Sequence, residues 1–109
     1  MKLFGKLSFS AAVLTFAVAM PAHAWDAERG EELSQPCAAC HGEDGNSASG
    51  NFPTSAGQYR DYLFQSMLAY QRGERTDPVM APQVEDLSQQ DLRDLAAFYA
   101  KQDGLYLKR

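Results

Sequence analysis

The stretch Cys37-Ala38-Ala39-Cys40-His41 decides the fold of this chain. If it forms a helical turn, the two cysteines, three residues apart, lie on one face of that turn. Each sulfur can then form a thioether with a haem vinyl group, and His41, the next residue, can direct a ring nitrogen at the iron. The spacing therefore predicts covalent attachment of one haem.

The same side chains have other known uses, namely a lone disulfide, a thioredoxin-like dithiol or a zinc site. Zinc needs about four ligands, and the chain has neither a second pair of cysteines nor a pair of histidines beside the motif. A thioredoxin-like dithiol is expected among alternating strands and helices, and no strand pattern in the chain is convincing. We favour haem attachment, and the dithiol stays open as an alternative.

Residues 1–24 have the pattern of a secretory signal peptide. Two lysines precede an apolar run, and Ala22-His23-Ala24 follows it as a cleavage site of the A-x-A type. The alternative is an uncleaved segment that holds the protein at the membrane, but the apolar run of about 14 residues is shorter than the roughly 20 that a membrane-spanning helix needs. We therefore expect cleavage after residue 24, and residues 25–109 as one mature domain in the periplasm, without a membrane span.

The charge and the length of the chain exclude several functions. The whole chain has 109 residues and a formal net charge of -4. Loss of the first 24 residues leaves 85 and removes two lysines, so 8 basic residues face 14 acidic ones and the charge becomes -6. An acidic, exported chain is not expected to bind nucleic acid, and this one is too short for a multi-domain enzyme. A domain of this size usually needs a disulfide, a metal or another non-protein core.

The second axial position of the iron has few candidate ligands. After cleavage His41 is the only histidine, and Met67 and Met80 are the only methionines. Met67 belongs to a run of apolar residues at helical spacing, which favours a place in the core. Met80 lies between Pro78 and Pro82, and two prolines so close together predict an extended, stiff segment that can present one side chain inward. We therefore favour Met80 as the ligand.

The rest of the sequence predicts helices joined by loops, with no strand. We expect a first helix over about Ala27 to Gln35, after which Pro36 ends it or starts a new turn that carries the cysteines. The other expected elements are a loop over 42–57, a helix over 59–72, and a last helix from the N-cap Ser88 to Gly104. The fold class predicted is all-α, with about three to four helices.

These features together resemble the class I c-type cytochromes, above all the small bacterial periplasmic members and one half of the periplasmic di-haem cytochromes. The resemblance covers essentially all of the mature chain. The pieces that carry it include the cysteine motif with Gly42-Glu43-Asp44-Gly45-Asn46-Ser47, then Phe52-Pro53, Asp77-Pro78-Val79-Met80 and Leu95-Ala96-Ala97-Phe98. It implies the small cytochrome c fold, with the helices wrapped around one covalently bound haem c.

The resemblance also implies roles for individual residues. Cys37 and Cys40 would attach the haem, and His41 and Met80 would be the axial ligands of its iron. The backbone carbonyl of Pro53 would orient His41 by accepting a hydrogen bond from its ring.

Two further contacts are expected. The resemblance implies that the first and last helices pack together, with Gly30 near Phe98 or Tyr99, because a glycine permits close approach. Arg60, Arg72 and Arg75 could each contact a haem propionate, since guanidinium pairs with carboxylates, and Arg75 is the one that we prefer.

An iron with both axial positions filled has no site for a substrate. The chemistry expected is therefore one-electron Fe(III)/Fe(II) cycling between redox partner proteins rather than enzymatic catalysis. The surplus of acidic residues favours partners with a basic docking patch. The alternatives are a haem c subunit of a larger dehydrogenase, or a ligand-binding or peroxidase-like protein if the sixth position is open. The chain would act as a monomer or a homodimer.

Overall fold

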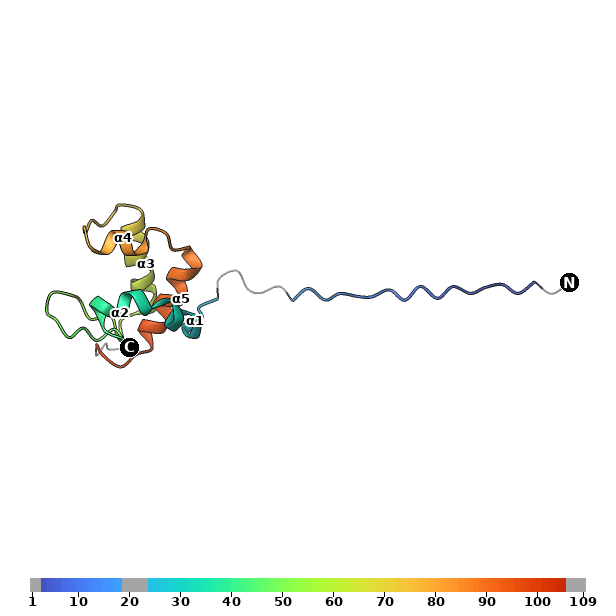
Figure 1. The fold of residues 1–109 in the computed structure, drawn as a ribbon, viewed down its shortest axis with the longest axis horizontal. Helices are drawn as coiled ribbons and strands as arrows, with labels where there is room; N and C mark the ends of the chain where they lie inside the picture. Colours follow the sequence, from blue (N-terminus) through green and yellow to red (C-terminus); the bar gives the residue numbers. More distant parts are fainter. Residues whose placement is uncertain (1–2, 19–23, 106–109) are drawn as a thin grey trace.

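A computed structural model describes residues 3–18 and 24–105 of the chain. Within these residues the fold is all-α, as predicted, and contains no strand (Figure 1). The helices are α1 (Ala27–Leu33), α2 (Gln35–His41), α3 (Arg60–Gln71), α4 (Met80–Val84) and α5 (Gln89–Ala100). Ala22 and His23 of the expected cleavage site lie outside the described residues. None of the helices described is long and apolar enough to cross a membrane.

The cysteine motif lies on a helix of its own, and the prediction that one helix continues to Gln35 is wrong. Ser34 ends α1, because its backbone N–H and its hydroxyl both bond to the carbonyl of Glu31. Pro36 falls in the first turn of α2, where the N–H that proline lacks would have no partner within the helix. Of the two roles expected for Pro36, the second holds, since it starts the turn that carries the cysteines.

The segment around Met80 is also helical, so the prediction of an extended segment is wrong. Met80 begins the short helix α4. Pro82 lies in the first turn of that helix, where proline is tolerated. The Asp77 carboxylate accepts hydrogen bonds from the backbone N–H groups of Val79 and Met80, each at 2.8 Å. With α2 and α4 as separate elements, the residues described form five helices instead of the expected three to four.

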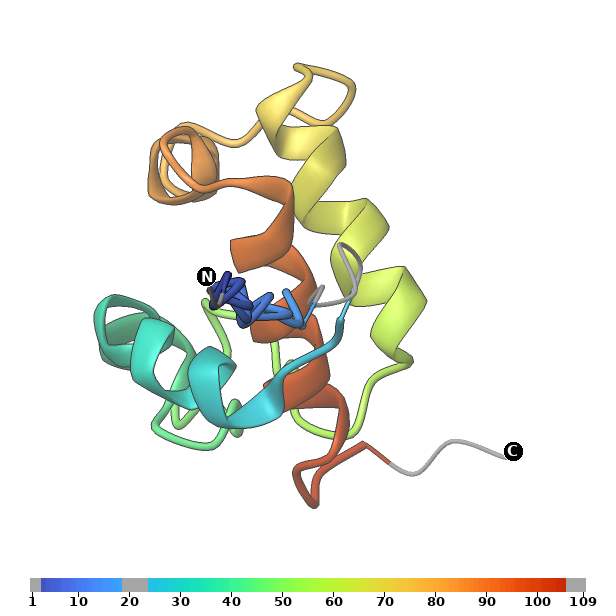
Figure 2. The same ribbon diagram turned by 90° about the vertical axis from the view of Figure 1, so that its right-hand side faces the viewer.

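Helix α5 is the centre of the fold. Figure 2 shows it between α3 on one side and α1 and α2 on the other. Its start is the capping box expected at Ser88, whose hydroxyl accepts the N–H of Asp91 while the Asp91 carboxylate accepts the N–H of Ser88. Its end is at Ala100 rather than at the predicted Gly104. Six apolar residues of α5 are buried, namely Leu92, Leu95, Ala96, Ala97, Phe98 and Tyr99.

Gly30 brings α1 into backbone contact with α5. A Cβ atom at this position would overlap the Asp94 carbonyl oxygen and lie 2.9 Å from the Cβ of Phe98. Only glycine leaves room for two helices this close. The contact of the first and last helices that the resemblance implied, with Gly30 beside Phe98, is therefore present.

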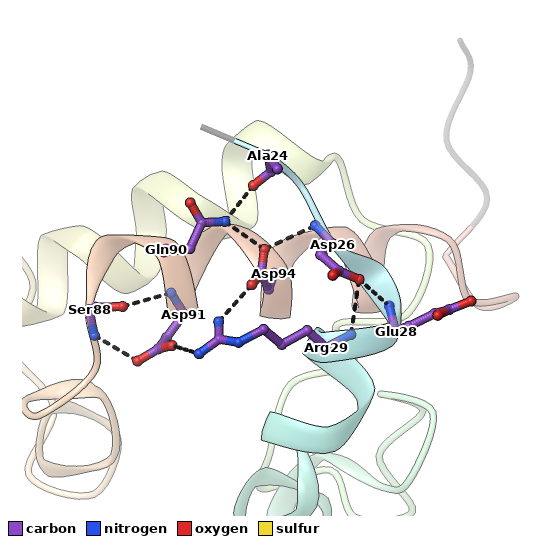
Figure 3. Close-up of polar contacts among 8 residues, drawn as sticks. All are labelled: Ala24, Asp26, Glu28, Arg29, Ser88, Gln90, Asp91 and Asp94. Carbon is purple, nitrogen blue, oxygen red and sulfur yellow. Dashed lines mark hydrogen bonds and ion pairs between the residues drawn. The ribbon is translucent and has the colours of Figure 1, made fainter. Parts of the chain in front are cut away.

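A group of polar residues, which we call the α1–α5 cluster, joins these two helices (Figure 3). It consists of Asp26, Arg29, Gln90, Asp91 and Asp94. Arg29 binds both Asp91 and Asp94, the latter at 2.7 Å, and the side chain of Asp94 is only 1% exposed. The other Asp94 oxygen accepts the backbone N–H of Asp26 at 2.9 Å and the amide of Gln90 at 2.8 Å. Both oxygens of the buried carboxylate therefore have hydrogen-bond donors.

The α1–α5 cluster predicts a loss of stability in acid. Burial acts to raise the pKa of Asp94, but hydrogen bonds from Asp26, Arg29 and Gln90 outweigh it and hold that pKa below the usual 3.8. A carboxyl whose pKa is lowered by folding stabilises the protein above its unfolded pKa and loses this contribution as the pH falls through its folded pKa. We expect the free energy of unfolding, measured with urea, to fall below about pH 4. In Asp94→Asn it should be about 1–3 kcal/mol lower at neutral pH and depend less on acid. An unchanged acid dependence would contradict this role for Asp94.

Candidate haem-binding site

One cavity contains every residue that the sequence predicts as a site residue. It has a volume of about 400 Å³ and lies between α2 and α4, with α3 and α5 also contributing to its lining. Figures 1 and 2 show α2 and α4 as separate helices on the same side of α5. The predicted residues that line the cavity are Cys37, Cys40, His41, Pro53, Arg75 and Met80.

Helix α2 presents both cysteines to the cavity. Cys37 and Cys40 are partly buried and carry free thiols, so they do not form a disulfide. A thioredoxin-like dithiol needs a thiol with a lowered pKa, whereas burial raises the pKa of Cys37. Among the residues described, no group of three or more His, Cys, Asp and Glu side chains could hold a metal ion by itself. The surroundings of the two sulfurs therefore do not favour a thioredoxin-like dithiol.

The ring of His41 is oriented by a loop. Its Nδ1 lies 2.9 Å from the carbonyl oxygen of Pro53, 12 residues further along the chain. A carbonyl oxygen can only accept a hydrogen bond, so Nδ1 carries the proton and donates it. In the neutral ring with this tautomer, the other nitrogen, Nε2, is the one free to bind a metal.

Two methionines line the cavity from different helices. Met80 stands at the first position of α4, where Asp77 holds its backbone N–H, and Met67 projects from α3. The hydrogen bonds from Met80 and Val79 keep the pKa of Asp77 below its usual value, so this carboxylate stays charged. Both methionine side chains also pack against the buried core around Phe64. The expected core position of Met67 is therefore present, although Met67 faces the cavity as well.

The arginines separate clearly by position. Arg75 lines the cavity, and its guanidinium lies 4.9 Å from the centre of the Tyr70 ring. Arg60 instead lies over the ring of Trp25, outside the cavity lining. Arg75 is therefore the better placed of the two to reach a carboxylate at the cavity mouth.

Two residues in this region were not identified from the sequence. Tyr99 lines the cavity, and its buried hydroxyl has no hydrogen-bond partner among the described residues. The resemblance had marked it only as a possible neighbour of Gly30. Asp77 was read only as part of a motif, although an aspartate whose carboxylate bonds to backbone N–H groups two and three residues later is a known turn signal.

The cavity fits a flat, largely apolar cofactor. Its volume lies in the range of about 300–1,000 Å³ that is usual for ligand sites, which combine apolar walls with a few polar groups. The apolar lining residues include Leu63, Met67, Val84, Leu87 and Leu95, and polar residues such as Asn51, Gln58 and Gln83 join them. The cysteine pair and the oriented histidine are the donors that a covalently bound haem needs. The residues present therefore fit haem c.

Comparison with known proteins agrees with this fit. The family model for cytochrome c matches residues 27–102. Cytochrome c4 of Pseudomonas aeruginosa is 44% identical over 91 residues, which cover 83% of this chain and 45% of that protein. Cytochrome c-554(548) of Halomonas halodenitrificans is 39% identical over 83 residues, which cover 73% of this chain and 100% of that protein.

A solved structure shares the fold as well. The crystal structure of reduced recombinant cytochrome c4 from Pseudomonas stutzeri superposes with a TM-score of 0.72 at 38% identity, covering 75% of this chain and 48% of that one. The chain thus spans about half the length of the cytochrome c4 relatives that it matches. The resemblance seen in the motifs is confirmed. The chain belongs to the cytochrome c family, whose cofactor is covalently bound haem c.

Proposed function

We propose that this protein is a one-electron carrier in which Cys37 and Cys40 hold the haem and His41 and Met80 bind its iron. The observation that carries the proposal is the presence of an oriented histidine on α2 and a methionine on α4 in one cavity with the cysteine pair. Haem bound in this way supplies the Fe(III)/Fe(II) couple. With His41 and Met80 as its two ligands, the iron would have no position left for a substrate, and we propose no catalytic activity.

The protein contributes orientation and an apolar environment. Pro53 fixes the tautomer of His41, and Asp77 fixes the backbone from which Met80 projects. The apolar lining would keep water away from a bound haem, and a low-dielectric site would disfavour the extra positive charge of the ferric state. A thioether ligand also favours the ferrous state relative to a second imidazole. Both effects raise the reduction potential.

We place the mature protein, residues 25–109, in the periplasm after cleavage of residues 1–24. Residues 3–18 form no helix or strand, and Figure 1 shows them extending away from the helical body. Their large apolar side chains are exposed, from 79% at Leu14 to 98% at Leu3. A segment this apolar that contributes nothing to the core supports the role of a removable leader.

Exposed apolar residues beside the cavity supply a docking surface for redox partners. Pro36 and Ala39 on α2 are exposed, as are Val79 and Pro82 at α4. A small apolar centre with a charged rim suits a short-lived complex. The acidic residues Glu28, Glu31, Glu32, Glu43, Asp44, Glu85 and Asp86 are all exposed, which supports partners with a basic patch.

Electron transfer with such a partner is expected to slow as salt is added. The Debye length falls from about 30 Å at 0.01 M to about 8 Å at 0.15 M ionic strength, so steering by acidic residues weakens. Between these conditions we expect the second-order rate, measured by stopped flow, to fall at least about threefold. Glu85→Gln, which removes an acid next to α4, should reduce both the rate and its salt dependence, and should do so more than Glu28→Gln, which removes an acid on α1. A rate that does not respond to salt would rule out the steering.

The axial ligation is tested by optical spectroscopy of the matured haem protein. We expect the ferric form to show the weak near-infrared band of sulfur ligation, and the ferrous form to leave its spectrum unchanged under carbon monoxide. Rapid carbon monoxide binding by the untreated ferrous protein would contradict the proposal and indicate an open iron. If the protein co-purifies stably with a catalytic polypeptide, it is a subunit of a dehydrogenase rather than a free carrier.

A further inference from the structure

The junction between the leader and the domain is built into the α1–α5 cluster (Figure 3). The carbonyl oxygen of Ala24 accepts a hydrogen bond from the amide of Gln90, which also donates to Asp94 at 2.8 Å. The next residue, Trp25, packs edge-on against Phe64 with ring centroids 5.6 Å apart. The chain is therefore held in place on both sides of the Ala24–Trp25 peptide bond.

Covalent geometry fixes where the nitrogen of Trp25 lies. The backbone N–H of Asp26, one residue further on, is 2.9 Å from a carboxylate oxygen of Asp94. One residue of chain spans at most about 3.8 Å, which keeps the Trp25 nitrogen within about 7 Å of that oxygen. The packing of the Trp25 ring prevents this end of the chain from moving far away.

The charges around this nitrogen do not balance. The α1–α5 cluster contains three carboxylates, those of Asp26, Asp91 and Asp94, and one guanidinium, that of Arg29. On α3, Arg60 lies 4.1 Å from the centre of the Trp25 ring and is paired with Asp61. Three more charged groups lie nearby. Glu28 of α1 is exposed, Arg93 of α5 lies over the ring of Phe64, and Lys101, just after α5, lines one pocket together with Trp25. Five carboxylates thus face four cations. The surroundings of the nitrogen are therefore net acidic and favour one more cation.

We propose that cleavage of the leader supplies this cation, so that the new α-ammonium group of Trp25 becomes a partner of Asp94 and stabilises the mature domain. The inference rests on the proposed cleavage after Ala24. Hydrolysis by a signal peptidase consumes one water and breaks the Ala24–Trp25 C–N bond. The new carboxylate leaves with the leader, and the amine on Trp25 takes up a proton at neutral pH, since α-amino groups have a pKa of about 7.7–8.0. Removal of the Ala24 carbonyl also opens the space beside Gln90 in which the ammonium can approach Asp94.

The proposal predicts a raised pKa at Trp25. An ammonium paired with a partly buried carboxylate should titrate about 0.5–1 unit above the usual α-amino range. A group whose pKa is raised on folding contributes its full stabilisation below the unfolded pKa and loses it as the pH rises through the folded pKa. The mature protein should therefore lose stability between about pH 8 and pH 9.5.

The experiment uses the mature, haem-loaded protein purified from the full chain. Insertion of Ser-Gly between Ala24 and Trp25 moves the terminal ammonium away but keeps a carbonyl for Gln90. At about pH 6 this variant should have an unfolding equilibrium constant about threefold to tenfold larger than that of the parent, and at about pH 10 the difference should vanish. In Asp94→Asn the insertion should change nothing, and in the control Glu28→Gln it should act as it does in the parent. NMR titration of the Trp25 amine gives its pKa directly.

Mass spectrometry separates the two ways in which the inference can fail. A mature chain that does not begin at Trp25 contradicts the proposed cleavage site. A chain that begins at Trp25, has an ordinary α-amino pKa and tolerates the insertion at both pH values leaves the cleavage intact and overturns the pairing with Asp94.

Discussion

Gly30→Ala is expected to destabilise the protein by about 3 kcal/mol or more, because it forces apart two helices that are in backbone contact. The added methyl group would overlap the carbonyl oxygen of Asp94, which belongs to the α5 backbone and cannot rotate away. Alanine is the better helix former by about 1 kcal/mol, so the steric effect must exceed this gain. Separation of α1 and α5 would also weaken the contact between Arg29 and Asp94. Urea unfolding of the haem-loaded protein measures the change.

Gly50→Ala is the matched control for this substitution. A Cβ atom at Gly50 would meet nothing within 4 Å, and its backbone does not have a positive φ. We expect its free energy of unfolding to stay within about 0.5 kcal/mol of the parent value. If the Gly30 and Gly50 variants are equally stable, the claim that α1 and α5 are in backbone contact at Gly30 is contradicted.

Met80→Ala is expected to open the sixth position of the iron. The near-infrared band of the ferric form should disappear, and the ferrous form should bind carbon monoxide. Loss of the sulfur also removes a ligand that favours the ferrous state, so the reduction potential should fall by about 0.1 V or more, within the roughly 0.8 V range that axial ligands set. Optical spectra and a redox titration measure these changes.

Met67→Ala separates ligation from packing. Met67 lines the same cavity from α3 and packs against the core, so its truncation should reduce stability by about 1–3 kcal/mol and leave the near-infrared band in place. If the band is lost in Met67→Ala and survives in Met80→Ala, then Met67 is the iron ligand and Met80 is not.

Local signals in the sequence carried most of the correct predictions. The capping box at Ser88 and the cysteine motif each depend on residues within a few positions of one another, and both form as expected. The errors lie where one residue has two possible roles. Pro82 was read as a helix breaker, but proline is compatible with a first turn, and Asp77 organises that turn from outside α4. The role of the Asp77 carboxylate becomes clear only when its backbone partners are known.

The residues of the candidate site also divide into those that have a local signal in the sequence and those that do not. Its predicted members could be found because each has a distinctive chemistry or motif, and all of them line one cavity. Tyr99 could not be found, because an apolar stripe shows that a side chain is buried but not that its hydroxyl lacks a partner. Nor does a sequence show that Met67 and Met80 face the same space, since α3 and α4 meet only through the packing of the whole chain.

The α1–α5 contact also determines the topology of the chain around the cofactor. The pair formed by Arg29 and Asp94 joins residues 65 positions apart, and every residue of the proposed site, from Cys37 to Met80, lies between them. The site is thus carried on a long loop whose two ends are closed by one helix pair. The entropy of closing such a loop grows only slowly with its length, so a single close contact at Gly30 can restrain the whole segment. Coordination of one iron from both parts of that segment would divide the loop into shorter ones, so docking of the terminal helices and ligand binding should reinforce each other during folding.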